Sequence, residues 1–256
     1  MKLRITSIPN LIIFLKRLKA VDRSVILELT EESLFSKVHT PDKSVMKFSS
    51  VVRNDVLEGV INWKEVEDDR IKIGIVDVTR LIEAFKHFRP EEEVFVEFSL
   101  AKSDGSCVAN ELKLVSASLS IKLRCADLSL LSYVEDSILN IVHSKEDYDV
   151  NFRIYQSDFS TVTSLCGLET NSEEILCFEV NDKSVHAIGD SFNYKLNIGS
   201  SEILFENSNS TSSPNIYKNQ LSYMEQETCQ VYVHENRLVL VSEQSSTSIA
   251  IGLVEK

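Results

Sequence analysis

The sequence predicts an α+β fold made of two similar domains of βαβββ type, with helices on one face of antiparallel sheets. Three observations lead to this prediction. A segment of the first half recurs in the second half, each copy follows a short amphipathic helix, and alternating apolar residues mark strands around both copies. The chain has 256 residues, which is enough for two domains of ordinary size.

The repeat relates residues 24–47 to residues 175–198 by a shift of 151 positions. The shift places Glu28 on Glu179 and apolar residues on apolar residues. Two copies of one unit predict an N-terminal domain over 1–125 and a C-terminal domain over 148–256.

Strands in the first half are predicted from apolar alternation, as in Val94-Phe-Val-Glu-Phe. Asp77 suits the N-cap of the second helix, and Pro90 ends that helix. The helices are expected at 9–20 and 77–88. The strands are expected at 2–7, 24–31, 33–40, 44–52, 57–63, 71–76, 92–102 and 107–125.

Residues 126–147 separate the two copies and contain many apolar residues among acids, without a clear period. We interpret this stretch as an interdomain connector. Because it is unusually apolar for a linker, we expect it to lie on a protein surface.

The second half repeats the order of the first. Pro214 suits the first turn of a helix, so a helix is predicted directly after it. The helices are expected at 157–168 and 215–225. The strands are expected at 148–155, 174–181, 184–190, 193–199, 202–207, 228–234, 237–243 and 247–254.

Apolar stripes on the helices predict their buried faces, and the opposite faces carry cations in an uneven way. The first two helices and their ends hold most of these cations, the fourth helix holds one, and the third holds none. The net charge of −12 comes from the second half of the chain. The predicted cationic positions are Lys16, Arg17, Lys19, Arg23, Arg80, Lys86, Arg89 and Lys218.

No pattern typical of an enzyme is found. The seven glycines form no phosphate-binding loop, and the five histidines show no metal-ligand spacing. Five cysteines without a C-x-x-C pair predict buried thiols in a reducing compartment. We therefore expect no catalytic residue, no metal and no cofactor, and we interpret the acid clusters at 65–69 and 91–93 as solvated loops.

The pattern resembles the DNA sliding clamps, namely proliferating cell nuclear antigen and the phage processivity clamps, over essentially the whole chain. Residues 9–48 resemble the first repeat of that family. IVDVTRLIEAFKHF (75–88), followed by EEEVFVEF, resembles its second helix and strand, and SIAIGLVEK resembles its last strand and short tail. Clamps have no signature motif, so the resemblance is one of order and pattern.

The resemblance implies a ring of subunits around duplex DNA that tethers a DNA polymerase and is placed by a clamp loader. A homotrimer is expected, with subunits joined through edge strands, for which 107–122 and 174–181 are candidates by analogy. The cationic positions would then face DNA phosphates without reading sequence. The resemblance also implies a pocket for partner peptides at Val45, Leu128, Leu131, Tyr133, Ile251 and Gly252.

The second domain departs from the clamp pattern because its helix 157–168 offers no cation. Two other functions therefore remain open: a subunit of a hetero-oligomeric, checkpoint-type clamp, and a duplicated α+β protein-binding module that does not bind DNA. We expect an intracellular protein, placed in the cytoplasm of a bacterial host if phage-encoded and in the nucleus if eukaryotic.

Overall fold

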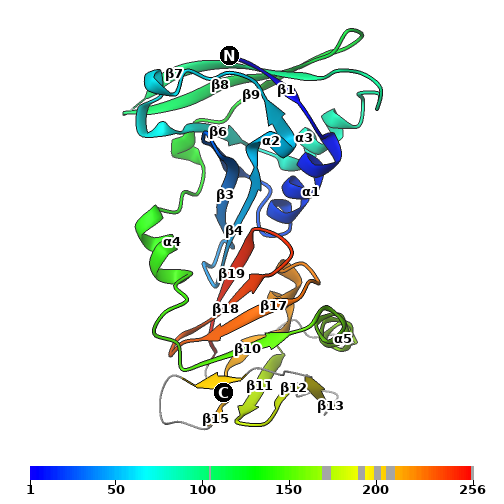
Figure 1. Cartoon of the computed structure of the whole chain (residues 1–256), viewed down its shortest axis with the longest axis vertical. Coiled ribbons are helices and arrows are strands. Elements are labelled where there is room, and N and C mark those ends of the chain that lie inside the picture. The colour runs from blue at the N-terminus through cyan, green and yellow to red at the C-terminus, as the bar shows by residue number, and fades with distance from the viewer. Residues whose placement is uncertain (104, 169–173, 190–193, 199–202, 206–210, 255–256) are drawn as a thin grey trace. The chain divides into compact units, whose positions relative to one another are not determined.

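The structure is a computed structural model that describes residues 1–103, 105–168, 174–189, 194–198, 203–205 and 211–254. The chain forms two compact units (Figure 1). The first unit holds Met1–His39 and Phe48–Val134, and the second holds Thr40–Lys47 and Glu135–Lys256. The predicted connector is therefore divided between the units after Val134, and a short segment of the N-terminal half belongs to the second unit.

The predicted repeat is present as the same hairpin in each unit. In the first unit, β2 (Val25–Leu29) pairs antiparallel with β3 (Ser33–His39). In the second, β11 (Ile175–Asn181) pairs with β12 (Val185–Gly189).

The register of the two hairpins follows the shift of 151 residues. Leu27 lies opposite Ser36 in the first copy, and Phe178 lies opposite Ala187 in the second. Both turns also close with an equivalent backbone hydrogen bond, 2.8 Å long in the first copy and 3.0 Å in the second. The sequence repeat is thus a structural repeat at the level of individual residue pairs.

The first unit is a mainly antiparallel sheet in the order β3-β2-β6-β8-β7-β1-β5, with β9 also paired to β8. Helices α1 (Ile8–Lys19) and α3 (Val78–Phe85) contact each other. Their apolar faces are buried. The further strands are β1 (Lys2–Ile5), β5 (Leu57–Glu58), β6 (Ile71–Ile75), β7 (Phe95–Ser103), β8 (Ser106–Val115) and β9 (Ser120–Arg124).

Two predictions for the first unit need correction. The strand expected at 57–63 is the two-residue β5, preceded by the helical turn α2 (Arg53–Val56) and followed by the 3-10 turns η1 (Trp63–Glu65) and η2 (Glu67–Asp69). The single strand expected at 107–125 is two strands, β8 and β9. A turn separates them, in which the Ser116 amide donates to the Leu119 carbonyl at 2.8 Å.

The second unit contains two sheets. One has the order β14-β10-β17-β18-β19, and in the other β11 lies between β12 and the short strands β15 and β16, with β13 beyond β12. Helix α5 (Gln156–Cys166) and the 3-10 helix η4 (Lys218–Tyr223) contact each other. The further strands are β10 (Val150–Ile154), β13 (Tyr194–Ile198), β14 (Leu204–Phe205), β15 (Thr211–Ser212), β16 (Asn215–Tyr217), β17 (Cys229–Val233), β18 (Arg237–Ser242) and β19 (Thr247–Gly252).

The α-helix predicted at 215–225 is wrong. Its first residues form β16, which pairs with β11, and Ile216 is fully buried there. The strand pairing supplies backbone partners that a helix would otherwise have to provide, so helical structure begins only at Lys218. The strand predicted at 202–207 falls partly outside the described residues, as does the end of the chain after Val254.

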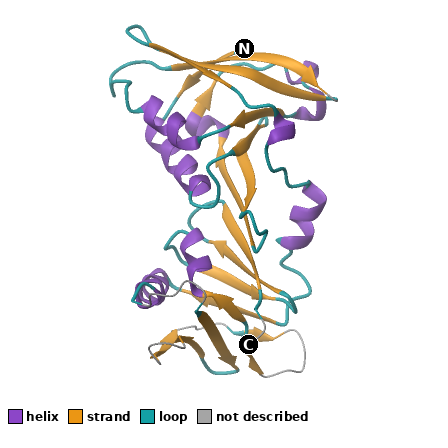
Figure 2. Cartoon of the chain, turned by 180° about the vertical axis from the view of Figure 1, so that it is seen from behind, coloured by secondary structure: helices purple, strands orange, loops and turns teal. Residues whose placement is uncertain are grey.

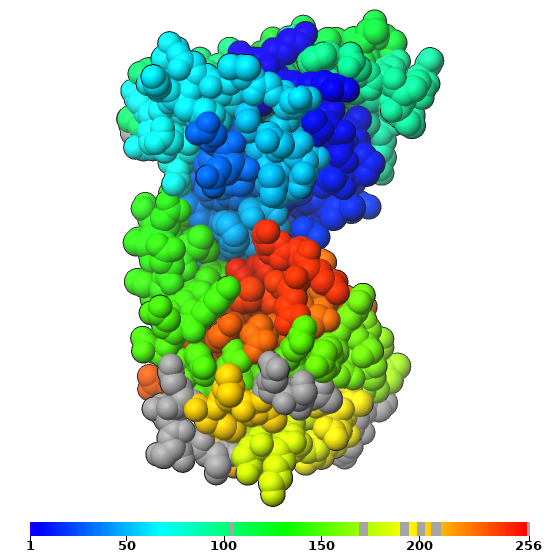
Figure 3. Space-filling view, in the orientation of Figure 1, coloured from blue at the N-terminus to red at the C-terminus, as the bar shows by residue number. Residues whose placement is uncertain are grey.

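The connector forms the 3-10 turn η3 (Leu128–Leu130) in the first unit and the helix α4 (Asp136–Val142) in the second. No residue of α4 is buried, and Ile138 and Ile141 are exposed. The green atoms of this part of the chain accordingly lie at the molecular surface in Figure 3. Among the described residues, no helix is long and apolar enough to cross a membrane.

The segment Thr40–Lys47 is fixed within the second unit by its side chains and backbone. The strand β4 (Val45–Val52) begins here, and Val45 is fully buried in the core of this unit. Lys47 is also fully buried, and its ammonium group donates to the Tyr223 carbonyl and the Glu225 carboxylate, both at 2.7 Å. A segment from the first half of the sequence is therefore an integral part of the second unit.

Candidate nucleic-acid interface

The predicted cationic surface is built on α1 and α3, which lie side by side in both cartoon views (Figure 2). Each helix begins at a capping side chain: Ser7 Oγ accepts from the Asn10 amide at 3.3 Å, and Asp77 Oδ1 accepts from the Thr79 amide at 2.8 Å. These caps satisfy amides that have no partner within the helix. The caps and the apolar stripes together fix which faces remain polar.

Most of the predicted cations on these helices and just beyond their C-terminal ends are exposed. Lys16, Arg23, Arg80, Lys86 and Arg89 are exposed, whereas Arg17 and Lys19 are half-buried. The residues 7–24 and 77–90 carry seven Lys and Arg against three Asp and Glu, although the whole chain has a net charge of −12. The two helices thus form a local positive surface on an acidic protein.

Only part of this positive charge is neutralised by neighbouring carboxylates. Arg80 lies 3.8 Å from Asp77 and Lys86 lies 2.6 Å from Glu83, both within the same helix turn. The hydrogen bond from Lys86, and then the charges of Lys86, His87 and Lys19, hold the pKa of Glu83 below its usual value. Since Lys19 ends α1 and Glu83 lies on α3, the polar faces of the two helices are electrostatically connected.

The C-terminal turn of α1 carries Lys16, Arg17 and Lys19. Cations are stabilised at a helix C-terminus, because the helix dipole is negative there. Lys16, Arg23 and Arg89 form no ion pair with a carboxylate in the described part of the chain. Such cations are available to phosphate groups, which bind Lys and Arg without regard to base sequence.

Helix α5 of the second unit carries no comparable surface. Asp158 is the only charged residue of α5. Two hydroxyl groups of this helix donate to its own backbone: Thr161 donates to Ser157 O at 2.9 Å and Ser164 donates to Ser160 O at 2.8 Å. The Ser160 hydroxyl donates to Gln226 Oε1 at 3.1 Å. Because the protons of these hydroxyls are already in hydrogen bonds, the hydroxyls are poor donors for a phosphate oxygen.

Lys218 does not join the cationic surface, which corrects the sequence prediction. Lys218 is only 6% exposed, and its ammonium group donates to Glu174 Oε2 at 3.1 Å. A buried ammonium group needs such a partner, because an unpaired buried charge is strongly unfavourable. Glu174 lies 44 residues earlier in the sequence, so the pattern of residues along the predicted helix could not reveal this ion pair.

The six residues predicted for a partner-peptide pocket fall in both units. Leu128 and Leu131 are half-buried and Tyr133 is exposed, all in the first unit. In the second unit, Ile251 and Val45 are fully buried in the core. There the amide of the sixth residue, Gly252, donates to Ser44 O at 2.9 Å.

The edge strands differ in part from those expected, because the predicted strand 107–122 covers both the inner strand β8 and the first residues of the edge strand β9. β8, within the predicted edge strand 107–122, has neighbours on both sides, and β11, at 174–181, is likewise an inner strand. Among the described strands, β9 and β13 each have one neighbour. These two strands therefore present unpaired backbone groups that another chain could use.

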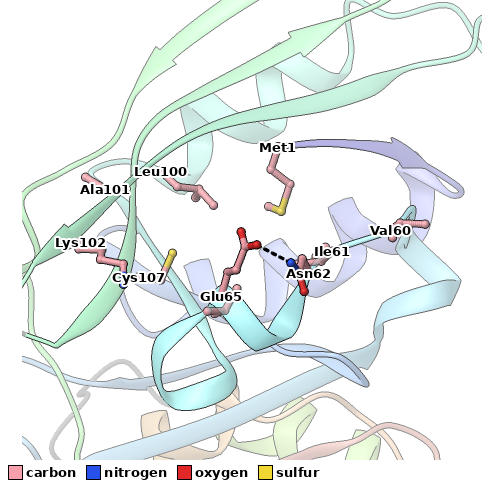
Figure 4. Close-up of a pocket in the computed structure, with 10 residues that line it drawn as sticks. Met1, Val60, Ile61, Asn62, Glu65, Leu100, Ala101, Lys102 and Cys107 are labelled. Carbon is pink, nitrogen blue, oxygen red and sulfur yellow. Dashed lines mark hydrogen bonds between the residues drawn. The ribbon is translucent and has the colours of Figure 1, made fainter.

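A separate pocket of about 440 Å³ lies in the first unit between β7, β8 and the η1 region (Figure 4). The Glu65 carboxylate accepts from the Asn62 side-chain amide at 2.6 Å, and burial raises the pKa of the Cys107 thiol above its usual value. A protonated thiol is a weak nucleophile. Within the described residues, no cluster of His, Cys, Asp and Glu could hold a metal ion.

Comparisons with known proteins place these features in a fold family. No protein-family model matches the sequence, and no curated protein matches it. Solved structures of proliferating cell nuclear antigen (PCNA) match the whole chain. The PCNA of A. fulgidus, solved with the C-terminal region of FEN-1, has a TM-score of 0.70 and 13% identity, covering 100% of this chain and 99% of that chain.

Two further structures give the same result. The PCNA of Entamoeba histolytica has a TM-score of 0.70 and 10% identity, with coverage of 99% of this chain and 98% of that chain. The PCNA2–PCNA3 complex of Sulfolobus tokodaii has a TM-score of 0.66 and 10% identity, with coverage of 99% of both chains. The likeness extends from one end of the chain to the other and concerns the fold.

Proposed function

We propose that this chain, which has the fold of the DNA sliding clamps, is a clamp that encircles duplex DNA and tethers a DNA polymerase and other replication proteins to it. The observation that carries the proposal is the positive surface of α1 and α3 on a chain that matches PCNA structures over its full length. The protein would act without chemistry of its own, as a processivity factor placed on DNA by a clamp loader.

The cations of α1 and α3 suit a sliding contact. Lys and Arg side chains on phosphates give binding that does not depend on base sequence and that weakens with salt. The proposed DNA-facing residues are Lys16, Arg17, Lys19, Arg23, Arg80, Lys86 and Arg89; Lys218 is omitted because it is buried. The uncharged helix α5 would then contribute little to the affinity for DNA.

The ring would close through β9 of one subunit and β13 of the next. Lysines on both strands are paired with glutamates of the same sheet: Lys122 lies 2.5 Å from Glu111, and Lys195 pairs with Glu179. Because these lysines are already neutralised, they add little repulsion between two such edges, and Arg124 of β9 is left as a cation without an ion pair in the described part of the chain. We propose three identical chains, each supplying two repeat units.

A hetero-oligomeric clamp is the second candidate. The absence of cations on α5 would suit a subunit whose DNA contact is shared with unlike chains. The PCNA2–PCNA3 complex of Sulfolobus tokodaii joins two such chains of this fold. A protein-binding module that never touches DNA is the remaining alternative.

Native mass spectrometry of the purified chain at low micromolar concentration separates these functions. Three chains per particle, together with loader-dependent retention on circular DNA, is the result expected for the homotrimeric clamp. A monomer that forms a ring only with other subunits would indicate the hetero-oligomeric clamp. A monomer that is never retained on circular DNA, with or without such subunits, would contradict both clamp proposals.

A further inference from the structure

A groove of about 990 Å³ in the first unit combines cationic, polar and apolar side chains. Strands β2, β6, β8 and β9 supply one part of its lining, and residues 125–129 with Tyr133 supply the rest. Its larger apolar residues are the buried Ile26 and Val108 and the half-buried Leu128, and its cations are Lys72 and Arg124. All of these residues belong to the first unit, so the groove is complete within it.

Tyr133 holds two lysines close to one aromatic ring at this groove. The ammonium nitrogens of Lys37 and Lys72 lie 4.8 Å and 4.7 Å from the ring centroid. Lys37 Nζ also lies 3.5 Å from the Tyr133 hydroxyl oxygen, and Lys72 Nζ lies 3.4 Å from Ser106 Oγ. Cation–π contact stabilises these ammonium groups but does not neutralise them.

The carboxylates near the groove are already occupied. Glu28 is 1% exposed and pairs with both Lys37 and Arg70 at 2.9 Å. Asp127, on the groove itself, accepts from the amide and hydroxyl of Ser129 at 3.0 and 2.9 Å.

The two cations that line the groove, by contrast, have no carboxylate partner in the described part of the chain. Neither Lys72 nor Arg124 forms an ion pair among the described residues. The groove therefore has an excess of positive charge, and that charge lies beside apolar side chains.

We propose that this groove binds an acidic segment of a partner protein. Carboxylate side chains of the segment would pair with Lys72 and Arg124, and its apolar side chains would contact the half-buried Leu128 and the exposed Tyr133 ring. The exposed Asn110 amide, which also lines the groove, offers both a donor and an acceptor to a peptide backbone.

The lining favours a peptide over other anions. A single small anion would leave most of this volume and its apolar side chains unused. A nucleic-acid strand carries a phosphate at every nucleotide, whereas this groove offers two unpaired cations and contains the carboxylate of Asp127. The groove shares Leu128 and Tyr133 with the proposed partner site, but the inference needs neither a ring nor DNA.

Fluorescence anisotropy with two labelled peptides tests this inference on the full chain. One probe alternates Glu with Leu, and the other replaces every Glu with Lys. The acidic probe is expected to bind with an affinity that falls as salt rises, and the basic probe is expected not to bind. Lys72→Gln with Arg124→Gln should weaken binding of the acidic probe by about tenfold, as expected when two ion pairs are removed.

Lys64→Gln with Lys113→Gln removes the same charge from the same unit outside the groove and should leave the affinity unchanged. Because Arg124 lies on the edge strand β9, Lys72→Gln is also tested alone, and it should weaken binding by about threefold. The native mass and thermal midpoint of each variant confirm that it is assembled and folded.

Three results would overturn the inference. These are acidic-probe binding weaker than roughly 1 mM, equal affinity for both probes, and equal losses in the groove variant and its control. If Lys72→Gln with Arg124→Gln abolished binding of a single-stranded oligonucleotide but left the affinity for the acidic probe unchanged, the groove would be reassigned to nucleic acid. A protein that is monomeric in solution but shows the expected peptide binding would contradict the proposed ring while supporting the groove.

Discussion

Glu28 and Glu179 occupy equivalent positions of the two repeat copies, yet Glu28 is buried and Glu179 is exposed. The Glu28 side chain is 1% exposed and pairs with Lys37 and Arg70. The Glu179 side chain is 45% exposed and pairs with Lys195 of β13. The two copies have thus kept a backbone register and a residue type while the environment of the carboxylate has changed.

This difference predicts unequal costs for the same substitution. Glu28→Gln should lower the free energy of unfolding by roughly 3–5 kcal/mol, because it leaves two cations in or near the core without their carboxylate. Glu179→Gln should change it by less than about 1 kcal/mol, because exposed ion pairs contribute little. Urea unfolding followed by circular dichroism measures both. A loss below about 1 kcal/mol in Glu28→Gln, as in Glu179→Gln, would show that the buried pair does not matter for stability.

The proposed DNA surface predicts a change in salt dependence. Lys16→Ala with Arg23→Ala and Arg89→Ala removes three exposed cations. The slope of log affinity for duplex DNA against log salt should flatten by up to about 0.9 for each phosphate that is no longer neutralised. Anisotropy of a short labelled duplex over a salt series measures the slope.

A matched variant controls for net charge in that experiment. Lys64→Ala with Lys102→Ala and Lys113→Ala removes three cations of the same unit that lie outside residues 7–24 and 77–90, and should leave the slope near that of the unmodified protein. If both triple variants flatten the slope equally, the effect comes from total charge, and the positive surface of residues 7–24 and 77–90 does not contact DNA.

His143 predicts an acid-dependent loss of stability in the second unit. Burial, and then the charge of Arg237, lowers the pKa of this imidazole from 6.5 to about 4. The unfolded chain therefore takes up this proton at a higher pH than the folded chain does. The contribution of neutral His143 to stability is complete above pH 6.5 and falls as pH drops towards 4, by up to about 3 kcal/mol.

His143→Asn tests this contribution, since an amide can still meet Ser248 Oγ, which lies 2.9 Å from the His143 Nδ1 atom. Unfolding free energies measured at pH 7 and pH 4 should differ less in the variant than in the unmodified protein. Identical pH dependence in the two proteins would mean that His143 is not held neutral by the fold.

The residues predicted for a partner pocket should separate into two groups on substitution. Ile251→Ala should lower the free energy of unfolding by about 2–5 kcal/mol, because Ile251 is fully buried in the core of the second unit. Leu131→Ala, at a half-buried site, should cost less than about 1.5 kcal/mol. Calorimetry with a polymerase-derived peptide should therefore use Leu131→Ala, and an Ile251→Ala variant of normal stability would contradict the structure.

Much of the fold could be predicted from local patterns. The hairpins around Glu28 and Glu179 follow from alternation and from the repeat, since both depend on residues near one another in sequence. Helices α1 and α3 follow from their apolar stripes and from the capping residues Ser7 and Asp77. The full-length likeness to PCNA structures bears out the resemblance in fold.

The errors lie where distant partners decide the outcome. Lys218 looked like a solvated helix residue, but Glu174 and the pairing of β16 with β11 bury it. The edge strands depend on which strands meet in space, which alternation does not encode. The groove around Lys72 and Tyr133 likewise joins segments about 60 residues apart, so local patterns could not reveal it.

The place of Thr40–Lys47 has a consequence for how the protein is made. These residues leave the ribosome early, but their partners Tyr223, Glu225 and Gly252 are among the last to be synthesised. Val45 and the ammonium group of Lys47 therefore remain without their native partners until translation is nearly complete. The second unit cannot reach its native core from its own contiguous stretch of chain, and a gene cut at the connector would yield two fragments that recover the fold only when mixed.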